Sequence, residues 1–535
     1  MSDGESSRRE LATGHGPLAT GFRIPDWILL LAFCAFFFFW RLAAFGLLGA
    51  DEPRYAQVAR EMLERHDWIT PTLGGTPWLE KPPLYYWQAR IAYQVFGVSD
   101  WAARLPSALD ASLLVFAAYW FLRRLRGSGL DGALMLACCA GVVGFARAAS
   151  TDMPLAAMFS IAMMAWFAWF ENNRRMYLLL FYAFVALGTL AKGPVALLLA
   201  VLMVVIFAAV KRTPKVVLRS ISFPGLAVFC AIALPWYVFV QIRNPEFFRV
   251  FIVQHNLARF GTNVFHHPEP LWYYLPVTLL GWVPWAVLAV LALAAALRRM
   301  RKDESDPLDA FLAIWIVLVI VFFSSSESKL PGYILPALPA GILLLANYWR
   351  TRAKIREHWA AMALHGMVSG TLLFAAFLLP AAVVRRHPAW DRSDILPLIV
   401  AVAIAAGVSR ATRRTLRVAT AVPAVLALAV ALRLGAPALN TTLSARAVSD
   451  ALSRIAPRPL PVADVLVSRE TEYGLEFYRN QKMPEDELRH PLAGEHLIVA
   501  GQGTEGAMAK GLGGRKFIYL GSFPAQKLEF FYVAP

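Results

Sequence analysis

Two adjacent carboxylates follow directly after the first long apolar run of the chain. Residues 49–55 read GADEPRY, and the apolar run before them covers residues 27–48. Asp51 and Glu52 can cap the helix that Pro53 begins, because acidic side chains favour a helix N-terminus. An ionised group next to lipid is also costly without a partner or a task, which favours an active-site role for Asp51. These residues alone leave both interpretations open.

A second block with chemical potential lies in the same polar segment. Residues 78–87 read WLEKPPLYYW. The two prolines fix the backbone and predict a second surface helix, and the aromatic cluster is typical of a bilayer interface. Lys81 is either an anchor that snorkels to the interface or a point charge at headgroup depth, where a lipid-linked phosphate would arrive.

Three further polar side chains stand at the ends of apolar runs. Asp152 begins one run, where it is either a helix cap or a second acid. Lys192 is the lone charge of a tight turn, so it either snorkels or faces the same headgroup region. Tyr333 opens another run, where tyrosines of the aromatic belt are common and where its hydroxyl can also donate to a phosphate.

The second long polar segment carries an arginine and three histidines. Arg259 offers a planar fork that suits phosphate, although an interfacial arginine is the commoner explanation. His266 and His267 are adjacent, and together with His255 and the earlier Glu80 they offer imidazole and carboxylate ligands to a zinc ion. No ligand spacing rule supports this metal site, so the expected role is structural.

The composition determines which elements must hold these side chains. Of 535 residues, 58% are hydrophobic and only 16% are charged, whereas soluble globular proteins carry about 25% charged residues. A soluble globular enzyme is therefore excluded. Apolar runs near the length of a membrane helix, about 20 residues, recur along the chain. We predict a polytopic α-helical membrane protein with about thirteen transmembrane helices, at 27–48, 107–122, 131–149, 153–170, 176–191, 194–210, 221–240, 271–297, 309–323, 331–348, 359–384, 394–409 and 415–434.

The net charge of +16 is explained by topology. The 52 Lys and Arg residues, against 36 Asp and Glu, concentrate in alternate short loops, for example at residues 123–126, 211–219 and 298–302. Cytoplasmic loops carry such an excess, so the N-terminus is predicted to be cytoplasmic and nucleic-acid binding becomes a minor alternative. An odd number of spans then leaves the chain from residue 440 outside.

This topology divides the chain into two domains. Residues 1–439 form a transmembrane domain with external loops at 49–106 and 241–270, and residues 440–535 form a small external α/β domain. The α/β assignment rests on short strand-like runs with helix-like stretches between them. These strands are predicted at Ala463–Val467, His496–Ala500, Lys516–Leu520 and Leu528–Val533.

Two other patterns argue against alternative chemistry. All four cysteines lie inside apolar runs, so none can form a disulfide in the external domain. Residues 501–506 read GQGTEG and satisfy GxGxxG, but the acidic residue expected about twenty positions later is missing and too little chain follows for a dinucleotide domain. The sequence shows no inverted repeat, which slightly disfavours a secondary transporter.

Three blocks resemble one family. ADEPRYA at 50–56, EKPPL at 80–84 and the pair Thr151-Asp152 resemble the bacterial lipid A aminoarabinose transferases, integral-membrane glycosyltransferases of the C-type fold. The resemblance implies inverting transfer of 4-amino-4-deoxy-L-arabinose from undecaprenyl phosphate to lipid A phosphates. This transfer takes place at the periplasmic face of the inner membrane and confers resistance to cationic peptides such as polymyxin. Relatives that mannosylate proteins share the acidic first loop, so another acceptor stays open, and a lipid or sugar transporter is the alternative of another class.

The resemblance also suggests roles for the residues above. It implies Asp51 and Asp152 as active-site acids, with Glu52 and Arg54 in the substrate cavity. The donor brings its own leaving group, so we expect no nucleotide and no cofactor for the chemistry. Cations must offset the charge that grows on the leaving phosphate. The candidates for that task are Lys81, Lys192, Arg259 and the hydroxyl of Tyr333.

The alternating basic loops generate a first prediction. Reporter fusions after Lys302 and after Pro535 should give opposite signals, because the two positions are predicted to lie on opposite sides of the membrane. Alkaline phosphatase and fluorescent protein fusions at both positions measure this directly. Matching signals would contradict the topology and the external location of the site.

Overall fold

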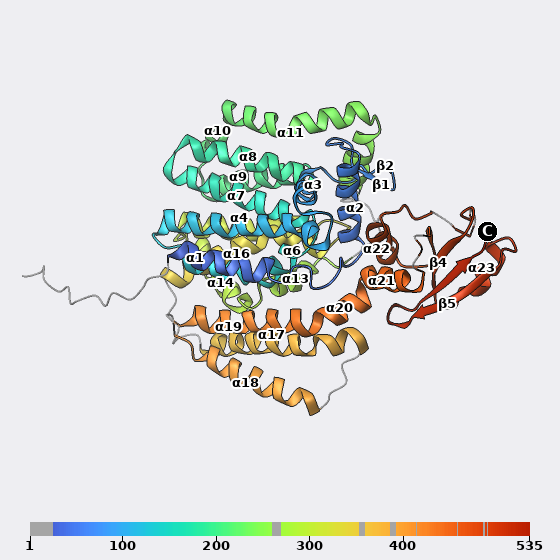
Figure 1. The fold of residues 1–535 in the computed structure, drawn as a ribbon. Helices are drawn as coiled ribbons and strands as arrows, with labels where there is room; N and C mark the ends of the chain where they lie inside the picture. Colours follow the sequence, from blue (N-terminus) through green and yellow to red (C-terminus); the bar gives the residue numbers. More distant parts are fainter. Residues whose placement is uncertain are drawn as a thin grey trace, which may run out of the picture.

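The computed structural model describes residues 25–258, 269–351, 359–385, 392–412, 415–456, 458, 460–484, 487–488 and 491–535. It is a bundle of apolar helices with a small α/β domain at one end (Figure 1). Within the described residues, eight helices are long and apolar enough to cross a membrane, or nine if one bent pair counts as a single span. The chain is therefore a polytopic helical membrane protein.

The helices of the bundle cover the predicted apolar runs, and three of them, starting at Asp26, Val195 and Ile395, are shorter than a full span. Two of the helices continue through a π-helical turn, at Ala35–Phe39 and Ala431–Gly435. The bundle consists of α1 (Asp26–Cys34), α4 (Asp100–Arg126), α5 (Leu130–Ala137), α6 (Ala140–Ala146), α7 (Asp152–Asn172), α8 (Arg175–Lys192), α9 (Val195–Val210), α11 (Phe223–Arg243), α13 (Tyr274–Trp282), α14 (Ala286–Arg301), α15 (Pro307–Ser324), α16 (Leu338–Thr351), α17 (Trp359–Arg385), α18 (Ile395–Ser409), α19 (Leu416–Val430) and α20 (Ala436–Leu443), with the short α10 (Lys215–Ser220) in a loop.

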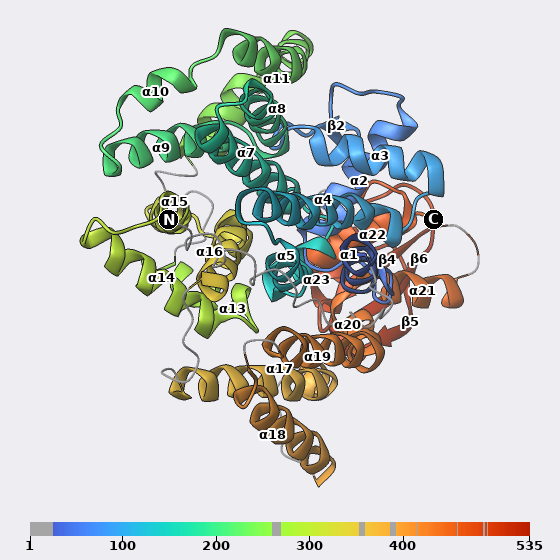
Figure 2. The ribbon, with the colours of Figure 1, turned by 90° about the vertical axis from the view of Figure 1, so that its left-hand side faces the viewer.

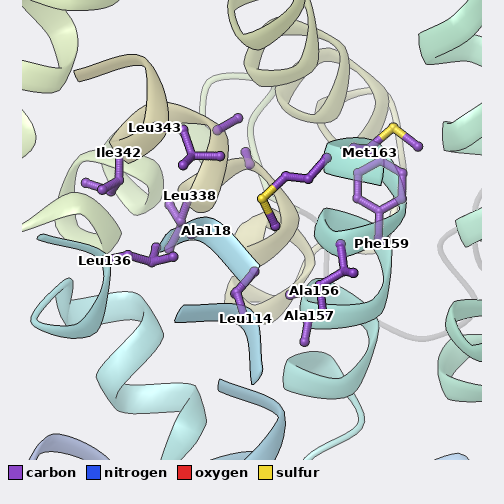
Figure 3. Close-up of a cluster of buried hydrophobic side chains, with 14 of the residues drawn as sticks. Leu114, Ala118, Leu136, Ala156, Ala157, Phe159, Met163, Leu338, Ile342 and Leu343 are labelled. Carbon is purple, nitrogen blue, oxygen red and sulfur yellow. The ribbon is translucent and has the colours of Figure 1, made fainter. Parts of the chain in front are cut away.

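The centre of the bundle is formed by small and apolar side chains. Helix α7 is buried over nearly its whole length and packs against α4 and α8, and the end-on view in Figure 2 shows it inside the bundle. Figure 3 shows Ala156 and Ala157 of α7 on the side of Leu114 of α4, and Leu338 of α16 beside Leu136 of α5. The alanines allow a close approach of these helices, which is the usual way in which membrane helices pack.

Polar contacts connect the predicted basic loops to one another. Arg126, at the end of α4, donates two 2.8 Å hydrogen bonds to the carboxylate of Asp306, which begins α15. Lys211, after α9, lies 3.3 Å from the carbonyl oxygen of Ser305. These loops lie at the end of the bundle opposite the α/β domain, which confirms that the basic loops gather at one end (Figure 1).

Two of the predicted spans are interrupted. The run at 131–149 breaks between α5 and α6 at Cys138 and Cys139, and the run at 271–297 bends by 116° between α13 and α14. The two breaks provide hydrogen-bond partners for each other. The Ala140 amide donates to the Val283 carbonyl at 2.8 Å, and the Trp285 indole donates to the Cys138 sulfur at 3.3 Å. Backbone groups inside a membrane need such partners.

The opposite end of the bundle carries residues 49–106, the loop that we predicted to be the first external loop. It contains α2 (Asp51–Glu64), a hairpin of β1 (Thr72–Leu73) and β2 (Thr76–Pro77), and α3 (Leu84–Phe96). The expected apolar stripe of α2 is buried, but α2 begins at Asp51, so Pro53 is its third residue and not its first. The prolines at 82 and 83 precede α3, as expected.

The second external loop contains the π-helix η2 (Phe248–Ala258), where a surface helix was predicted. A third short external element, the 3-10 helix η3 (Pro331–Ala337), leads into α16. The remaining 3-10 turns are η5 (Arg392–Asp394) and η7 (Pro524–Gln526).

The C-terminal domain contains a four-stranded mixed sheet, as its strand-like runs predicted. The strand order is β3-β4-β6-β5, with β3 parallel to β4 and the other pairs antiparallel. Its elements are α21 (Ala445–Ile455), β3 (Val462–Val465), α22 (Arg469–Arg479), β4 (His496–Gly501), α23 (Glu505–Gly511), β5 (Phe517–Phe523) and β6 (Leu528–Val533). Helix α22 lies against α2, so the domain covers the first external loop (Figure 1).

Candidate active site

Asp51 is the first residue of α2 and forms an ion pair with Arg54, one turn later. The Asp51 side chain is 52% exposed, whereas the Arg54 side chain is 14% exposed. The Asp51 carboxylate is therefore exposed to solvent, and its partner, the Arg54 guanidinium, is largely buried. The helix N-terminus adds a favourable dipole interaction, but the N-cap residue is Ala50 and no side-chain capping hydrogen bond is formed there, so the structure does not support the predicted capping role of Asp51.

Glu52 points the other way, into the protein. Its carboxylate accepts hydrogen bonds from the Arg104 guanidinium at 2.6 and 3.1 Å, and Arg104 has no exposed side-chain surface. Arg104 also donates to the carbonyl oxygens of Leu42, Phe45 and Gly46 at 2.8–3.1 Å. Burial raises the pKa of Glu52, and the Arg104 charge opposes part of that shift. Glu52 thus fixes the turn between the first helix and α2.

Lys81 is held between the β1–β2 hairpin and α3. It is only 8% exposed, and its ammonium donates to the Glu80 carbonyl at 3.3 Å. The hairpin is fixed by Glu61 of α2, whose carboxylate accepts from the Thr72 hydroxyl at 2.7 Å and from the Gly74 amide at 2.8 Å. A snorkelling lysine exposes its ammonium, so the burial of Lys81 favours a charge held for a purpose.

Asp152, Lys192 and Tyr333 meet at the ends of three helices. Asp152 begins α7 and forms an ion pair with Lys192, the last residue of α8, and the Lys192 ammonium lies 4.3 Å from the centre of the Tyr333 ring. The Ser150 hydroxyl donates to Asp152 at 2.9 Å. Gly332 allows this approach, because a β-carbon there would lie 2.5 Å from the Asp152 carboxyl carbon. Lys192 is therefore paired and not snorkelling.

Besides burial, Asp51 and Asp152, the two carboxylates predicted to be catalytic, both raise the pKa of Tyr55. Burial is the main cause that raises the pKa of Tyr55, and the charges of Asp51 and Asp152 both add to the shift. Burial also raises the pKa of Tyr86, with further contributions from Asp51 and Glu80. Both phenols therefore stay protonated at neutral pH. Tyr55 is thus influenced by the charges of both Asp51 and Asp152.

Several polar contacts join the second loop to the first, including a 3.0 Å hydrogen bond that the Asn244 amide donates to the Thr70 hydroxyl. The His255 imidazole of η2 lies 3.7 Å from the Glu80 carboxylate. Arg243, at the end of α11, forms a 3.0 Å ion pair with Asp67. Within the described residues no group of three or more His, Cys, Asp and Glu side chains could hold a metal ion. The remaining predicted residues, Arg259, His266 and His267, lie outside the described residues.

Sequence reasoning missed three positions that build this site. Arg104 lies just before the predicted apolar run at 107–122. A charged side chain so close to a span needs a partner, and that requirement was the available signal. Ser150 precedes the Thr151-Asp152 pair, and its small hydroxyl carries no distinctive pattern. Gly332 lies in the loop KLPGY, where its need for close packing depends on a neighbour far away in the chain.

The arrangement suits the transfer of a group carried by a phosphate. Buried lysines and an exposed carboxylate gather at one end of a membrane bundle, where lipid headgroups lie. The family model of the dolichyl-phosphate-mannose-protein mannosyltransferases matches residues 27–251, which contain α2, α3 and the Asp152–Lys192 pair. This match covers less than half of the chain, and it indicates the class of membrane glycosyltransferases.

Full-length relatives define the family within this class. An undecaprenyl phosphate-α-4-amino-4-deoxy-L-arabinose arabinosyl transferase of Pseudomonas paraeruginosa is 31% identical over 72% of this chain and 70% of the relative. The corresponding transferase of Pseudomonas aeruginosa is 30% identical over the same shares. The chain belongs to the family of undecaprenyl phosphate-aminoarabinose arabinosyl transferases.

A solved structure supports the fold. The crystal structure of ArnT from Cupriavidus metallidurans bound to undecaprenyl phosphate matches with a TM-score of 0.75, covering 95% of this chain and 97% of that chain at 23% identity. Its apo structure matches with a TM-score of 0.77 at 24% identity. The fold of this chain is therefore the fold of ArnT.

The buried pair of Arg104 and Glu52 generates a stability prediction. Arg104→Ala should destabilise the protein by about 3–5 kcal/mol, because a buried carboxylate and three carbonyl groups lose their partner. Thermal unfolding in detergent, followed by near-UV circular dichroism, measures the effect. Arg65→Ala is the matched control, since Arg65 is 45% exposed and lies 3.8 Å from Asp67. Equal unfolding midpoints for the two variants would contradict the role of Arg104.

Proposed function

We propose that this protein transfers 4-amino-4-deoxy-L-arabinose from undecaprenyl phosphate to the phosphates of lipid A, a change that protects cells against cationic peptides such as polymyxin. Membership of the arabinosyl transferase family carries the proposal. The buried Lys81 and the Asp152–Lys192 pair support it, because both lysines lie at the external end of the bundle. Undecaprenyl phosphate is bound in the ArnT structure that shares this fold.

The donor phosphate is the leaving group. As the bond between C1 of the sugar and the phosphate oxygen breaks, negative charge grows on undecaprenyl phosphate, and fixed cations stabilise it. We assign this task to Lys81 and Arg259, with Lys192 nearby and the Tyr333 hydroxyl as a donor. The reaction needs no nucleotide and no cofactor, since the bond that breaks already joins the sugar to a good leaving group.

The acceptor is a phosphate that is largely ionised near neutral pH, because its second pKa is near 6. A phosphate oxygen attacks C1 from the side opposite the leaving group, so a single displacement inverts the configuration. A strong general base is unnecessary for such a nucleophile. Asp51 instead orients the acceptor, accepts its residual proton, or contacts the ammonium of the sugar. Asp152 is the neighbouring acid, and Arg54 borders the substrate cavity. Glu52, which was expected there too, is turned away toward the buried Arg104 and has a structural role instead.

The topology that fits this reaction has thirteen spans. Besides the long helices, the shorter apolar helices α1, α9 and α18, the broken pair α5–α6 and the bent pair α13–α14 each account for one crossing in this proposal. The N-terminus is cytoplasmic, and the site and the C-terminal domain face the periplasm from the inner membrane. The excess of Lys and Arg at the other end supports this orientation.

Two alternatives differ in testable ways. A different acceptor, such as a protein or a glycan, would use the same donor site, and the family match to the protein mannosyltransferases keeps it open. A transporter would use broken helices and charges near mid-membrane. Broken helices are present, but the breaks at 138–139 and 283–285 contain no Asp, Glu, Lys or Arg. The acidic and basic residues described above lie at the ends of the bundle.

We also propose that a structural zinc ion binds at Glu80 and His255. Glu80 and His255 offer an oxygen and a nitrogen 3.7 Å apart, close to the separation expected when zinc bonds to each at about 2.0–2.2 Å. His266 and His267 would complete the ligand set. The ion would tie the two external loops together, and the phosphate nucleophile needs no metal-bound hydroxide.

Metal analysis of the purified protein tests this site. We expect one zinc per chain in the wild type and less than about half of that in His255→Ala, because a structural site needs four ligands. A chelator should lower the thermal midpoint of the wild type, since bound metal stabilises the folded state. Substoichiometric zinc that is unchanged in His266→Ala and His267→Ala would contradict the proposal.

Asp51→Asn separates chemistry from capping. The two residues cap a helix about equally well, so a purely capping Asp51 predicts an almost silent substitution. If Asp51 serves the reaction, transfer should fall by more than tenfold, about 1.4 kcal/mol or more in the barrier, while the thermal midpoint stays near that of the wild type. Activity above a tenth of the wild-type value would remove Asp51 from the catalytic residues.

The purified protein offers a direct test of the proposed function. Synthetic undecaprenyl phosphate-aminoarabinose and lipid A in detergent should yield aminoarabinose-modified lipid A and free undecaprenyl phosphate in equal amounts. Transfer to a peptide or glycan but not to lipid A would support the alternative acceptor. Release of neither product, with vesicles that move the donor across the bilayer, would support a transporter.

A further inference from the structure

The C-terminal domain contributes a side chain to the surroundings of Asp51. We propose that Tyr473 of α22 holds the Arg54 guanidinium, and that Arg54 in turn orients the Asp51 carboxylate, so that Tyr473 and Arg54 are positioning residues for the reaction. The proposal rests on the proposed function, because it assigns a task within the same site. It gives the C-terminal domain a part in catalysis.

Three aromatic rings enclose the Arg54 guanidinium. Its central carbon lies 5.3 Å from the ring centre of Tyr55, 5.1 Å from that of Trp78 and 5.5 Å from that of Tyr473. The rings come from α2, from the end of the β1–β2 hairpin and from the C-terminal domain. A guanidinium within about 6 Å of a ring is attracted by the ring face, most strongly when it is desolvated. Arg54 is therefore held from three sides.

The guanidinium has few alternatives to this geometry. Its Nε atom is buried and has no hydrogen-bond partner, so the side chain gains nothing from solvent at that atom. Its charge is balanced by Asp51, which is much more exposed than Arg54 itself. An exposed carboxylate on a flexible side chain would sample several rotamers. Pairing with a fixed guanidinium limits Asp51 to the orientations that keep the ion pair.

Tyr473 itself is fixed by the docking of its domain. Phe477, one turn later on α22, is buried in the apolar cluster beneath α2 and α3. The Tyr478 hydroxyl donates to Asp100 at 2.6 Å and accepts from the Leu47 amide at 2.7 Å. Arg446 of α21 donates to the same Asp100 carboxylate at 2.7 Å. The C-terminal domain therefore contacts both α2 and the segment directly before it.

Kinetics of the purified full-length protein test the proposal. Tyr473→Leu removes the ring and keeps an apolar side chain, so kcat should fall at least tenfold while KM for the donor changes less than threefold. Tyr473→Phe keeps the ring and should restore most of the turnover. Arg54→Lys keeps the charge but loses the planar fork and its stacking, so it should lower kcat by a similar factor.

A double variant distinguishes positioning from a general packing role. If Tyr473 acts only through Arg54, the kcat of the Tyr473→Leu, Arg54→Lys double variant should equal that of Arg54→Lys alone, because residues in one network are not additive. Independent roles would multiply the two losses and overturn the proposal. Tyr519→Leu, at a half-exposed tyrosine on β5 of the same domain, is the control and should leave kcat unchanged.

The remaining outcomes are also decisive. Wild-type kcat in Tyr473→Leu would overturn the proposal. If Tyr473→Leu does not fold, Arg54→Lys decides, and near wild-type kcat in that variant would overturn the proposal. A wild-type protein that transfers no aminoarabinose would refute the proposed function instead, so the two failures are distinguishable.

Discussion

The wholly buried guanidinium of Arg104 is the interaction on which the external end of the molecule depends. A charge without exposed surface is tolerated only when partners satisfy it, and Arg104 finds them in Glu52 and in three carbonyl groups of residues 42–46. These contacts fix the turn that carries the chain from the first helix into α2. Because Asp51 is the neighbour of Glu52 and begins α2, its location follows from the same interaction. The C-terminal domain adds to this constraint, since Tyr478 bonds to Leu47 in the next part of the turn.

The same physical rule organises the charges around the site. Lys192 pairs with Asp152 and Arg243 pairs with Asp67, in both cases across two different segments, whereas Arg54 pairs with Asp51 within α2. Each pair joins elements that are distant in the sequence or orients a group at a helix end. Such pairing allows charged side chains to lie close to a membrane. The interrupted helices use backbone partners instead, and their breaks are free of acidic and basic residues.

Much of the fold was predictable because it follows from local pattern. Strands such as His496–Gly501 combine apolar and β-branched residues between turns, and α2 shows a helical apolar stripe, so their positions could be read within a few residues. The breaks at 138–139 and 283–285 could not, because the apolar runs continue through them. Asp51 and Lys81 could be proposed from the sequence because they stand out in one segment, and their roles in the reaction stay predictions. The meeting of Arg54 with Tyr473 could not be predicted, because it depends on how two domains dock.

We propose that the buried Lys81 and its neighbouring cations stabilise the leaving phosphate during transfer to lipid A. Mass spectrometry of lipid A tests it in Gram-negative cells that lack their own transferase and express either the wild type or Lys81→Ala at equal levels. The account predicts lipid A with added aminopentose for the wild type and unmodified lipid A for Lys81→Ala, because loss of a fixed cation should cost at least two orders of magnitude in rate, about 2.7 kcal/mol. Equal modification by the folded Lys81→Ala protein would contradict the account.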